Sequence, residues 1–201
     1  MFPVKQIEQF IQSAKGSLKI YEQTLIKWQK AVNLVSANSL NDIWNRHILD
    51  SAQLYPYIPK NAKILVDMGS GAGFPAMVIA ILNKIFQGSL TDIYLIESDT
   101  KKCIFLREVA RILDVQVHIL NERLEKITNI KADVITSRAL ARIDKLIEYG
   151  HPFIHEETVF LLLKGENVQE ELKSNQINCQ VDIFSSQTDN SGCIVKLSEV
   201  K

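Results

Sequence analysis

The spacing of hydrophobic residues changes character after the first sixty positions. Over residues 7–35, apolar residues recur three and four positions apart, which is typical of a helix with one buried face. A break near Gly16 is expected to divide this stretch into a short helix and a longer one. A second amphipathic helix is predicted over residues 39–58, capped by Ser39 or Asn41 and closed by two prolines.

Beyond residue 62, short apolar runs alternate with helical patterns. Seven stretches have the length and composition of strands: 63–69, 92–98, 115–120, 132–139, 158–165, 179–184 and 192–198. Helical patterns over 75–86, 100–113 and 141–150 fit crossovers between buried parallel strands. The last two strands lack room for a helix between them and predict an antiparallel hairpin. We therefore expect an α/β protein with an N-terminal helical extension (1–60) and one compact sheet domain (61–201).

Composition narrows the class of protein only slightly. The 201 residues are 46% hydrophobic and 23% charged, as in ordinary globular proteins, and the formal net charge is zero. The first sixty residues nevertheless hold seven Lys or Arg against four Asp or Glu, which hints at an anionic partner there. The N-terminus lacks the apolar core of a signal peptide, and no apolar run reaches the ~20 residues that span a bilayer. A cytoplasmic protein without membrane contact is expected.

The most informative stretch is "ILVDMGSGAGFPA" at 64–76, where three alternating glycines follow an acid. A phosphate-binding P-loop would need Lys and then Ser or Thr after the glycines, and a dinucleotide fingerprint would need glycine at position 74, which is Phe74. A simple strand-to-helix turn remains a weaker alternative, since it does not need three alternating glycines. The pattern resembles motif I of class I S-adenosyl-methionine-dependent methyltransferases. That resemblance implies a Rossmann-like seven-stranded sheet, with Asp67 facing the cofactor ammonium and Glu97 accepting the ribose hydroxyls.

Four further motifs point to a particular family. They are "NLVS" at 33–36, "RHILDS" at 46–51, "SRA" at 137–139 and "LKG" at 163–165. From about Leu25 to the C-terminus, the chain resembles the glucose-inhibited division protein B family, which methylates a guanine of bacterial small-subunit (16S) ribosomal RNA to 7-methylguanosine. The resemblance implies S-adenosyl-L-methionine as cofactor and small-subunit ribosomal RNA, or the 30S particle, as partner. We expect a monomer.

Residue roles follow from the loop and from the resemblance. The predicted cofactor-binding residues are Asp67, Gly69, Gly71, Gly73, Phe74, Glu97, Leu124, Glu125 and Arg138. Leu124 stands where many relatives have a small residue, so its contact with adenine is expected through the backbone. Ala76 replaces a glycine that often follows the Phe-Pro pair, which tightens the turn without blocking the ligand.

The acceptor side of the site is expected to be basic. The predicted catalytic residues are Arg138, Arg123 and His47, and the predicted substrate-binding residues are Arg46, His47, Lys101, Lys102 and Lys164. Asp50 lies one helical turn beyond Arg46 and is expected to pair with it. No metal is expected, because a proline between the two histidines of "HPFIH" argues against a helix that presents both, and the three cysteines form no CxxC pair.

The expected chemistry needs little acid–base help. A guanine ring nitrogen has a free lone pair, so the protein's main contribution would be alignment of donor and acceptor. Two other interpretations stay open. One is an enzyme of the same fold that methylates a small molecule or a protein. The other is a non-catalytic module that senses the cofactor or binds ribosomal RNA.

Overall fold

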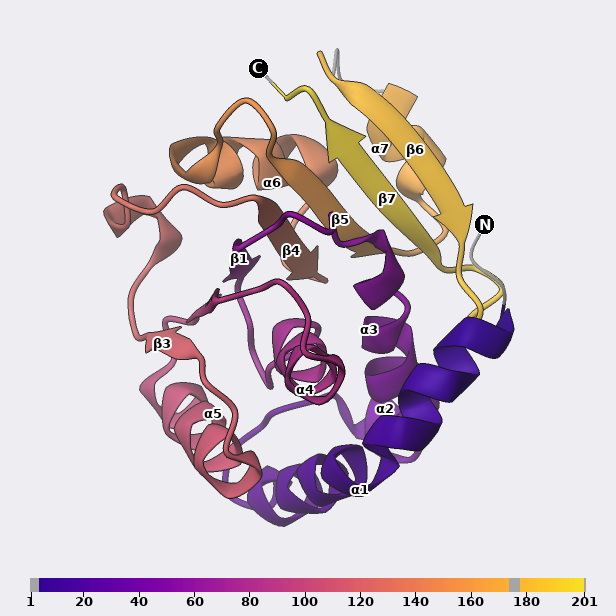
Figure 1. Ribbon diagram of the computed structural model, residues 1–201, viewed down its shortest axis with the longest axis vertical. Coiled ribbons are helices and arrows are strands. Elements are labelled where there is room, and N and C mark those ends of the chain that lie inside the picture. The colour runs from indigo at the N-terminus through magenta and orange to yellow at the C-terminus, as the bar shows by residue number, and fades with distance from the viewer. Residues whose placement is uncertain (1–3, 174–177, 201) are drawn as a thin grey trace.

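The computed structural model describes residues 4–173 and 178–200, and its centre is one seven-stranded sheet (Figure 1). The strands are β1 (Ile64–Met68), β2 (Asp92–Ile96), β3 (His118–Leu120), β4 (Val134–Arg138), β5 (Val159–Lys164), β6 (Gln180–Ser185) and β7 (Cys193–Ser198). Their spatial order is β3-β2-β1-β4-β5-β7-β6. The first five run parallel, whereas β7 is antiparallel to both β5 and β6. The predicted α/β class, seven strands and C-terminal hairpin are confirmed.

Helices cover both faces of this sheet, as buried parallel strands require. One face packs against α4 (Ala76–Phe86) and α5 (Thr100–Leu113), and the N-terminal α1 (Val4–Gln29) packs against these two helices. The other face packs against α6 (Ile143–Gly150), the short helix η4 (His151–Phe153) and α7 (Val168–Lys173). Among the helices of the described segments, none combines the length and the apolarity that crossing a bilayer requires.

Helix α1 is continuous, so the break expected near Gly16 is wrong. Its buried side chains form one stripe at alternating spacings of four and three: Ile7, Ile11, Ala14, Leu18, Tyr21 and Leu25. Gly16 lies on the exposed side with no heavy atom near the place a Cβ would occupy. A glycine inside a helix costs only about 0.5–1 kcal/mol relative to alanine, and the buried stripe on either side offsets that cost.

The single helix predicted over 39–58 is also wrong, because the chain there changes helical type several times. It forms α2 (Ala37–Leu40), the π-helix η1 (Trp44–Leu49), α3 (Asp50–Ala52) and the 3₁₀ helix η2 (Tyr55–Tyr57). The N-cap of α2 is Ser36, whose side chain accepts the Ser39 N–H; Ser39 lies within the helix and Asn41 is its C-cap, so neither is the N-cap. π-helical turns often occur at functional sites.

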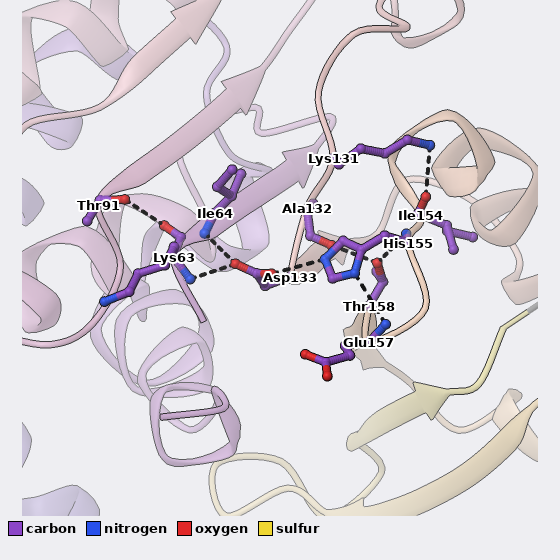
Figure 2. A network of polar contacts seen from close by, with 10 residues as sticks. All are labelled: Lys63, Ile64, Thr91, Lys131, Ala132, Asp133, Ile154, His155, Glu157 and Thr158. Atoms are coloured by element: carbon purple, nitrogen blue, oxygen red, sulfur yellow. Dashed lines mark hydrogen bonds and ion pairs between the residues drawn. The ribbon is translucent and has the colours of Figure 1, made fainter. Parts of the chain in front are cut away.

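At the amino ends of β1, β4 and β5, a polar network centred on Asp133 holds the strands together (Figure 2). One carboxylate oxygen accepts the N–H groups of Lys63 at 2.6 Å and Ile64 at 2.8 Å, and the other lies 3.0 Å from His155 Nε2. His155 Nδ1 accepts the Glu157 N–H, so Nε2 carries the proton that bonds to Asp133. His155 therefore has a structural role at the sheet edge.

Candidate functional site

At the opposite, carboxyl edge of the sheet, the glycine loop joins β1 to α4. Gly69, Gly71 and Gly73 all have positive φ, which explains why each is glycine. At Gly73 space is limiting as well, because an added Cβ would lie 2.7 Å from the Tyr21 hydroxyl and 2.9 Å from Leu106. Tyr21 also donates its hydroxyl hydrogen to the Ala72 carbonyl, so α1 holds the loop through this side chain. The third glycine thus meets the protein's own core.

Asp67, in β1 just before the loop, carries an unsatisfied charge. Its side chain is fully buried; Oδ1 accepts the Thr136 hydroxyl at 2.7 Å, whereas Oδ2 is buried and has no partner in the described part of the chain. Burial raises the pKa of Asp67 to about 6, against the lowering effect of the Thr136 and Ser70 hydrogen bonds and of Arg138. A buried oxygen without a partner is costly, so this one marks a place where a positively charged donor would be stabilising.

Glu97 follows β2 and lies beside the loop. It is buried; Oε2 accepts the Gly71 N–H at 2.8 Å and Oε1 accepts the Asp99 N–H at 2.7 Å. Each carboxylate oxygen has two lone pairs, so both can still accept a ligand hydroxyl. The structure therefore brings Asp67, Glu97 and the glycine loop together, as the sequence predicts.

The π-helix η1 delivers two neighbouring side chains to different environments. His47 is buried and stacks on Phe74 with ring centroids 4.9 Å apart, and neither ring nitrogen has a partner among the described residues. Burial, followed by Arg138 and Arg46, lowers the pKa of His47 to about 3, so the ring is neutral near pH 7. Arg46, the residue before it, is exposed.

Arg138 ends β4 and joins these elements. Its Nη1 donates to the Arg46 carbonyl at 3.0 Å, and its guanidinium carbon lies 5.2 Å from the Phe74 ring centroid. Burial lowers the pKa of Arg138, while Asp50, Tyr21 and Asp67 act in the opposite direction. The next residue, Ala139, has a φ of 54°, a left-handed conformation that is strained for a non-glycine residue.

A cavity of about 890 Å³ opens on the far side of Arg138. Arg46, Asp50 and Arg138 form one wall, residues 163–167 another, and the β6–β7 loop at 187–192 a third. Its size is that of a typical pocket for a small ligand. Arg138 thus lies between the cavity and Phe74 of the glycine loop.

Several predicted site residues have other environments. Lys164 lines the cavity, but its ammonium lies 2.8 Å from the Glu171 carboxylate and donates to the Ala141 carbonyl, so its charge is compensated within the protein. Lys101 and Lys102 begin α5, where the Asp99 side chain accepts both of their backbone N–H groups. They lie near Glu97, which accepts the Asp99 N–H, and they do not line the cavity.

The predicted residues at 123–125 belong to the short helix η3 (Leu124–Lys126), which follows β3 at the same edge of the sheet. Leu124 is half-buried and packs against the core, whereas Arg123 and Glu125 are exposed. Arg123 is the N-cap residue of η3 and does not line the cavity that Arg138 lines.

Sequence reasoning missed a second set of residues around the cavity. Asp50 does not pair with Arg46 in the described part of the chain, which corrects that expectation; its Oδ1 instead lies 3.1 Å from Gln53 Nε2 and 3.2 Å from the Thr188 hydroxyl. Gln53 and the β6–β7 loop are 133 or more positions apart in sequence, so no local pattern could connect them. Within the described residues, no three His, Cys, Asp or Glu side chains group as metal ligands.

The residues around the glycine loop fit S-adenosyl-methionine by their own chemistry. The cofactor's ammonium requires a buried acceptor, and Asp67 Oδ2 has no partner among residues 4–173 and 178–200. Its ribose hydroxyls require an acceptor at the end of the second strand, where Glu97 lies. The positive-φ glycine loop allows the backbone to approach such a ligand closely.

Comparisons with known sequences agree with one another. A family model described as GidB, rRNA small subunit methyltransferase G, matches residues 14–193. A protein of Paramagnetospirillum magneticum named Ribosomal RNA small subunit methyltransferase G is 42% identical over 185 residues, which cover 91% of this chain and 87% of that protein. One of the same name from Dinoroseobacter shibae is 37% identical over 189 residues, covering 93% of this chain and 96% of its own length.

Solved structures resemble the fold at low sequence identity. The ribosomal protein L11 methylase of Lactobacillus delbrueckii subsp. bulgaricus has a TM-score of 0.61 at 14% identity, covering 78% of this chain and 79% of that one. M. jannaschii TYW2 in complex with AdoMet has a TM-score of 0.54 at 17% identity, covering 77% and 76%. At these identities the likeness shows the methyltransferase fold alone.

Proposed function

Because the chain belongs to the GidB family, rRNA small subunit methyltransferase G, we propose that it transfers the methyl group of S-adenosyl-methionine to N7 of a guanine in small-subunit (16S) ribosomal RNA. The observation that carries this proposal is the meeting of two sites at Arg138. On one side lies the glycine loop with the buried Asp67, whose Oδ2 has no partner among the described residues, and on the other a cavity that Arg46 and Arg138 help to line.

The cofactor would be held at the carboxyl edge of the sheet. Asp67 takes the ammonium and Glu97 the ribose hydroxyls, while the loop from Gly69 to Phe74 supplies backbone contacts. Leu124 and Glu125 border the same edge beyond β3. When bound, S-adenosyl-methionine supplies an electrophilic methyl group on its sulfonium.

The acceptor would enter the cavity beside Arg138. The lone pair on guanine N7 is free, so the chain needs no general base, and His47 with a pKa of about 3 is a poor one. We assign His47 a packing role, in which its stacked ring holds Phe74 and the adjacent Arg138 in place. Arg138 has five N–H donors and uses one on the Arg46 carbonyl, which leaves others to orient the base.

Charge around the cavity suits a base that becomes cationic on N7 methylation. Asp50 lines the cavity, and its carboxylate faces Arg138 closely enough to oppose the effect of burial on the pKa of that arginine. Burial raises the pKa of Asp50, while Arg138 and the hydrogen bonds from Thr188 and Gln53 oppose that rise, and the ionised carboxylate would offset the charge of the methylated base. Arg46 is exposed at the rim, where it suits an RNA phosphate.

The partner we propose is the ribosomal RNA itself or the 30S particle, met by a monomer in the bacterial cytoplasm. Because the net charge is near zero, we expect the chain to bind a preassembled particle through a local basic patch of its own, and not to bind naked RNA tightly. Lys101 and Lys102 are the candidates for phosphate contacts on the cofactor side of the patch.

A labelling experiment tests the proposal. Small subunits from a strain that lacks this protein are incubated with the purified chain and methyl-labelled S-adenosyl-methionine, and the RNA is digested to nucleosides. We expect label in 7-methylguanosine. Cofactor binding without any labelled nucleoside would favour a non-catalytic module, and label on a protein or small molecule would favour a different acceptor for the same fold.

A further inference from the structure

Gln53 makes an unusual set of polar contacts for a core residue. Gln53 is only 1% exposed, yet its amide reaches the loop between β6 and β7. Its Oε1 accepts the Gln187 N–H at 2.6 Å, and its Nε2 lies 3.1 Å from both the Ser186 and the Thr188 hydroxyls. The Asp50 carboxylate lies 3.1 Å from the same Nε2 and 3.2 Å from the Thr188 hydroxyl.

These contacts fix one wall of the cavity. Residues 187–192 form the wall contributed by the loop, and the residues of its tip, Asp189, Asn190 and Ser191, are exposed. Within the loop, the Ser186 hydroxyl accepts the N–H groups of Thr188 and Asp189 at 3.1 and 3.3 Å. Gln53 therefore binds residues 186–188, whose Ser186 hydroxyl also holds the start of the loop tip.

Resting on the proposed function, we propose that Gln53 is a positioning residue for the acceptor nucleotide. It holds the β6–β7 loop as a preformed wall of the cavity that Arg46 and Arg138 also line. An apolar side chain could fill the same buried space, but it would leave the Gln187 N–H and the Thr188 hydroxyl without this partner. With fewer contacts left, among them those to Asp50 and within itself, the loop would be less ordered before the acceptor binds, and the ordering on binding would lower affinity.

The position of Gln53 predicts which kinetic constant changes. Its hydrogen bonds go to Asp50 and to the loop, and none of them involves Asp67, Glu97 or the glycine loop. Loss of Gln53 should therefore raise KM for the small subunit and leave the dissociation constant of S-adenosyl-methionine unchanged. Amide hydrogen exchange in the loop should become faster in the same variant.

The test compares four variants with the wild-type chain on small subunits from a strain that lacks the protein. We expect Gln53→Ala to raise KM about tenfold and Thr188→Val about threefold, with Thr188→Ser close to wild type because it keeps the hydroxyl. The matched control is Asn83→Ala, which removes a side-chain amide that bonds Leu90 N and O near the amino end of β2. It should lower the melting temperature and leave KM unchanged.

Two results would overturn the inference while leaving the proposed function intact. One is wild-type KM and loop exchange in Gln53→Ala, with a fall in melting temperature like that of Asn83→Ala. The other applies if Gln53→Ala does not fold, and it is an equal KM in Thr188→Val and Thr188→Ser. A wild-type chain that binds the cofactor but labels no guanine would instead overturn the proposed function, and this inference with it.

Discussion

Two aspartates at opposite edges of the same sheet have opposite environments. Asp133, at the amino edge, accepts two backbone N–H groups and bonds to His155 (Figure 2). Burial raises the pKa of Asp133, but the hydrogen bonds from Ile64, Lys63 and His155 outweigh it and leave that pKa below its ordinary value. Asp67, in β1, keeps one oxygen for which the described residues offer no partner, and burial raises its pKa to about 6.

The difference separates polar groups that hold the fold from those that await a ligand. At the amino edge, each carboxylate oxygen is satisfied by the protein, so Asp133 stabilises the folded state. At the carboxyl edge, burial of Asp67 is only partly compensated, so its charge lowers the stability of the folded state until a cation binds. The rise of the Asp67 pKa from its ordinary value of 3.8 to about 6 means that the folded protein disfavours the ionised carboxylate by roughly 3 kcal/mol.

The largest expected effect comes from neutralising Asp67. Asp67→Asn should weaken binding of S-adenosyl-methionine at least ~100-fold, because a buried carboxylate–ammonium pair is lost. The same change should raise the melting temperature at pH 7, since the penalty for a buried charge disappears. Calorimetric titration and thermal denaturation measure the two effects. Tight cofactor binding by Asp67→Asn would contradict the assignment.

Removing the guanidinium fork of Arg138 should come next in size. Arg138→Lys keeps the positive charge but cannot bond the Arg46 carbonyl and also present further donors in a fixed plane. We expect kcat/KM for the small subunit to fall about 10- to 100-fold. The companion variant Lys164→Met removes a charge already compensated by Glu171, and a similar loss there would show that charge alone matters.

At the amino edge, the expected effect is on stability alone. Asp133→Ala should lower the free energy of unfolding by about 2–3 kcal/mol, because it leaves two backbone donors and His155 without their acceptor. Cofactor affinity should not change. Urea denaturation gives the first quantity, and Asp92→Ala is a matched control, since it breaks an Asp–His pair at an exposed site and should change stability much less.

The smallest effect should come from the lysines that begin α5. Each lysine that binds a phosphate contributes a slope of about one to the salt dependence of binding. The double variant Lys101→Ala with Lys102→Ala should therefore have a smaller slope, and its KM near physiological salt should rise roughly 3-fold. KM measured at several salt concentrations tests this. A KM and a slope unchanged from wild type would remove both residues from the RNA surface.

Most of the fold follows from local sequence, because buried strands and positive-φ glycines are specified by the residues themselves. The loop at 64–76, with Asp67 before its glycines, and Glu97 after the second strand are predictable for this reason. The π-helix at Trp44–Leu49 is not, since it forms where His47 packs on Phe74, which is distant in sequence. The same holds for Lys164, whose pairing with Glu171 depends on how β5 and α7 meet, and for Gln53, whose partners lie in the β6–β7 loop.

The most direct test of the comparison between the two aspartates is the pH dependence of cofactor affinity. Because the folded-state pKa of Asp67 lies above its ordinary value, its ionisation makes the folded protein less stable as pH rises from 3.8 towards about 6. Ionised Asp67 is the form that binds an ammonium. Calorimetric titration with S-adenosyl-methionine between about pH 5 and pH 7 should therefore show affinity falling as the pH drops through about 6, with no such change in Asp67→Asn. An affinity that does not vary over this range in the wild-type chain would contradict the account.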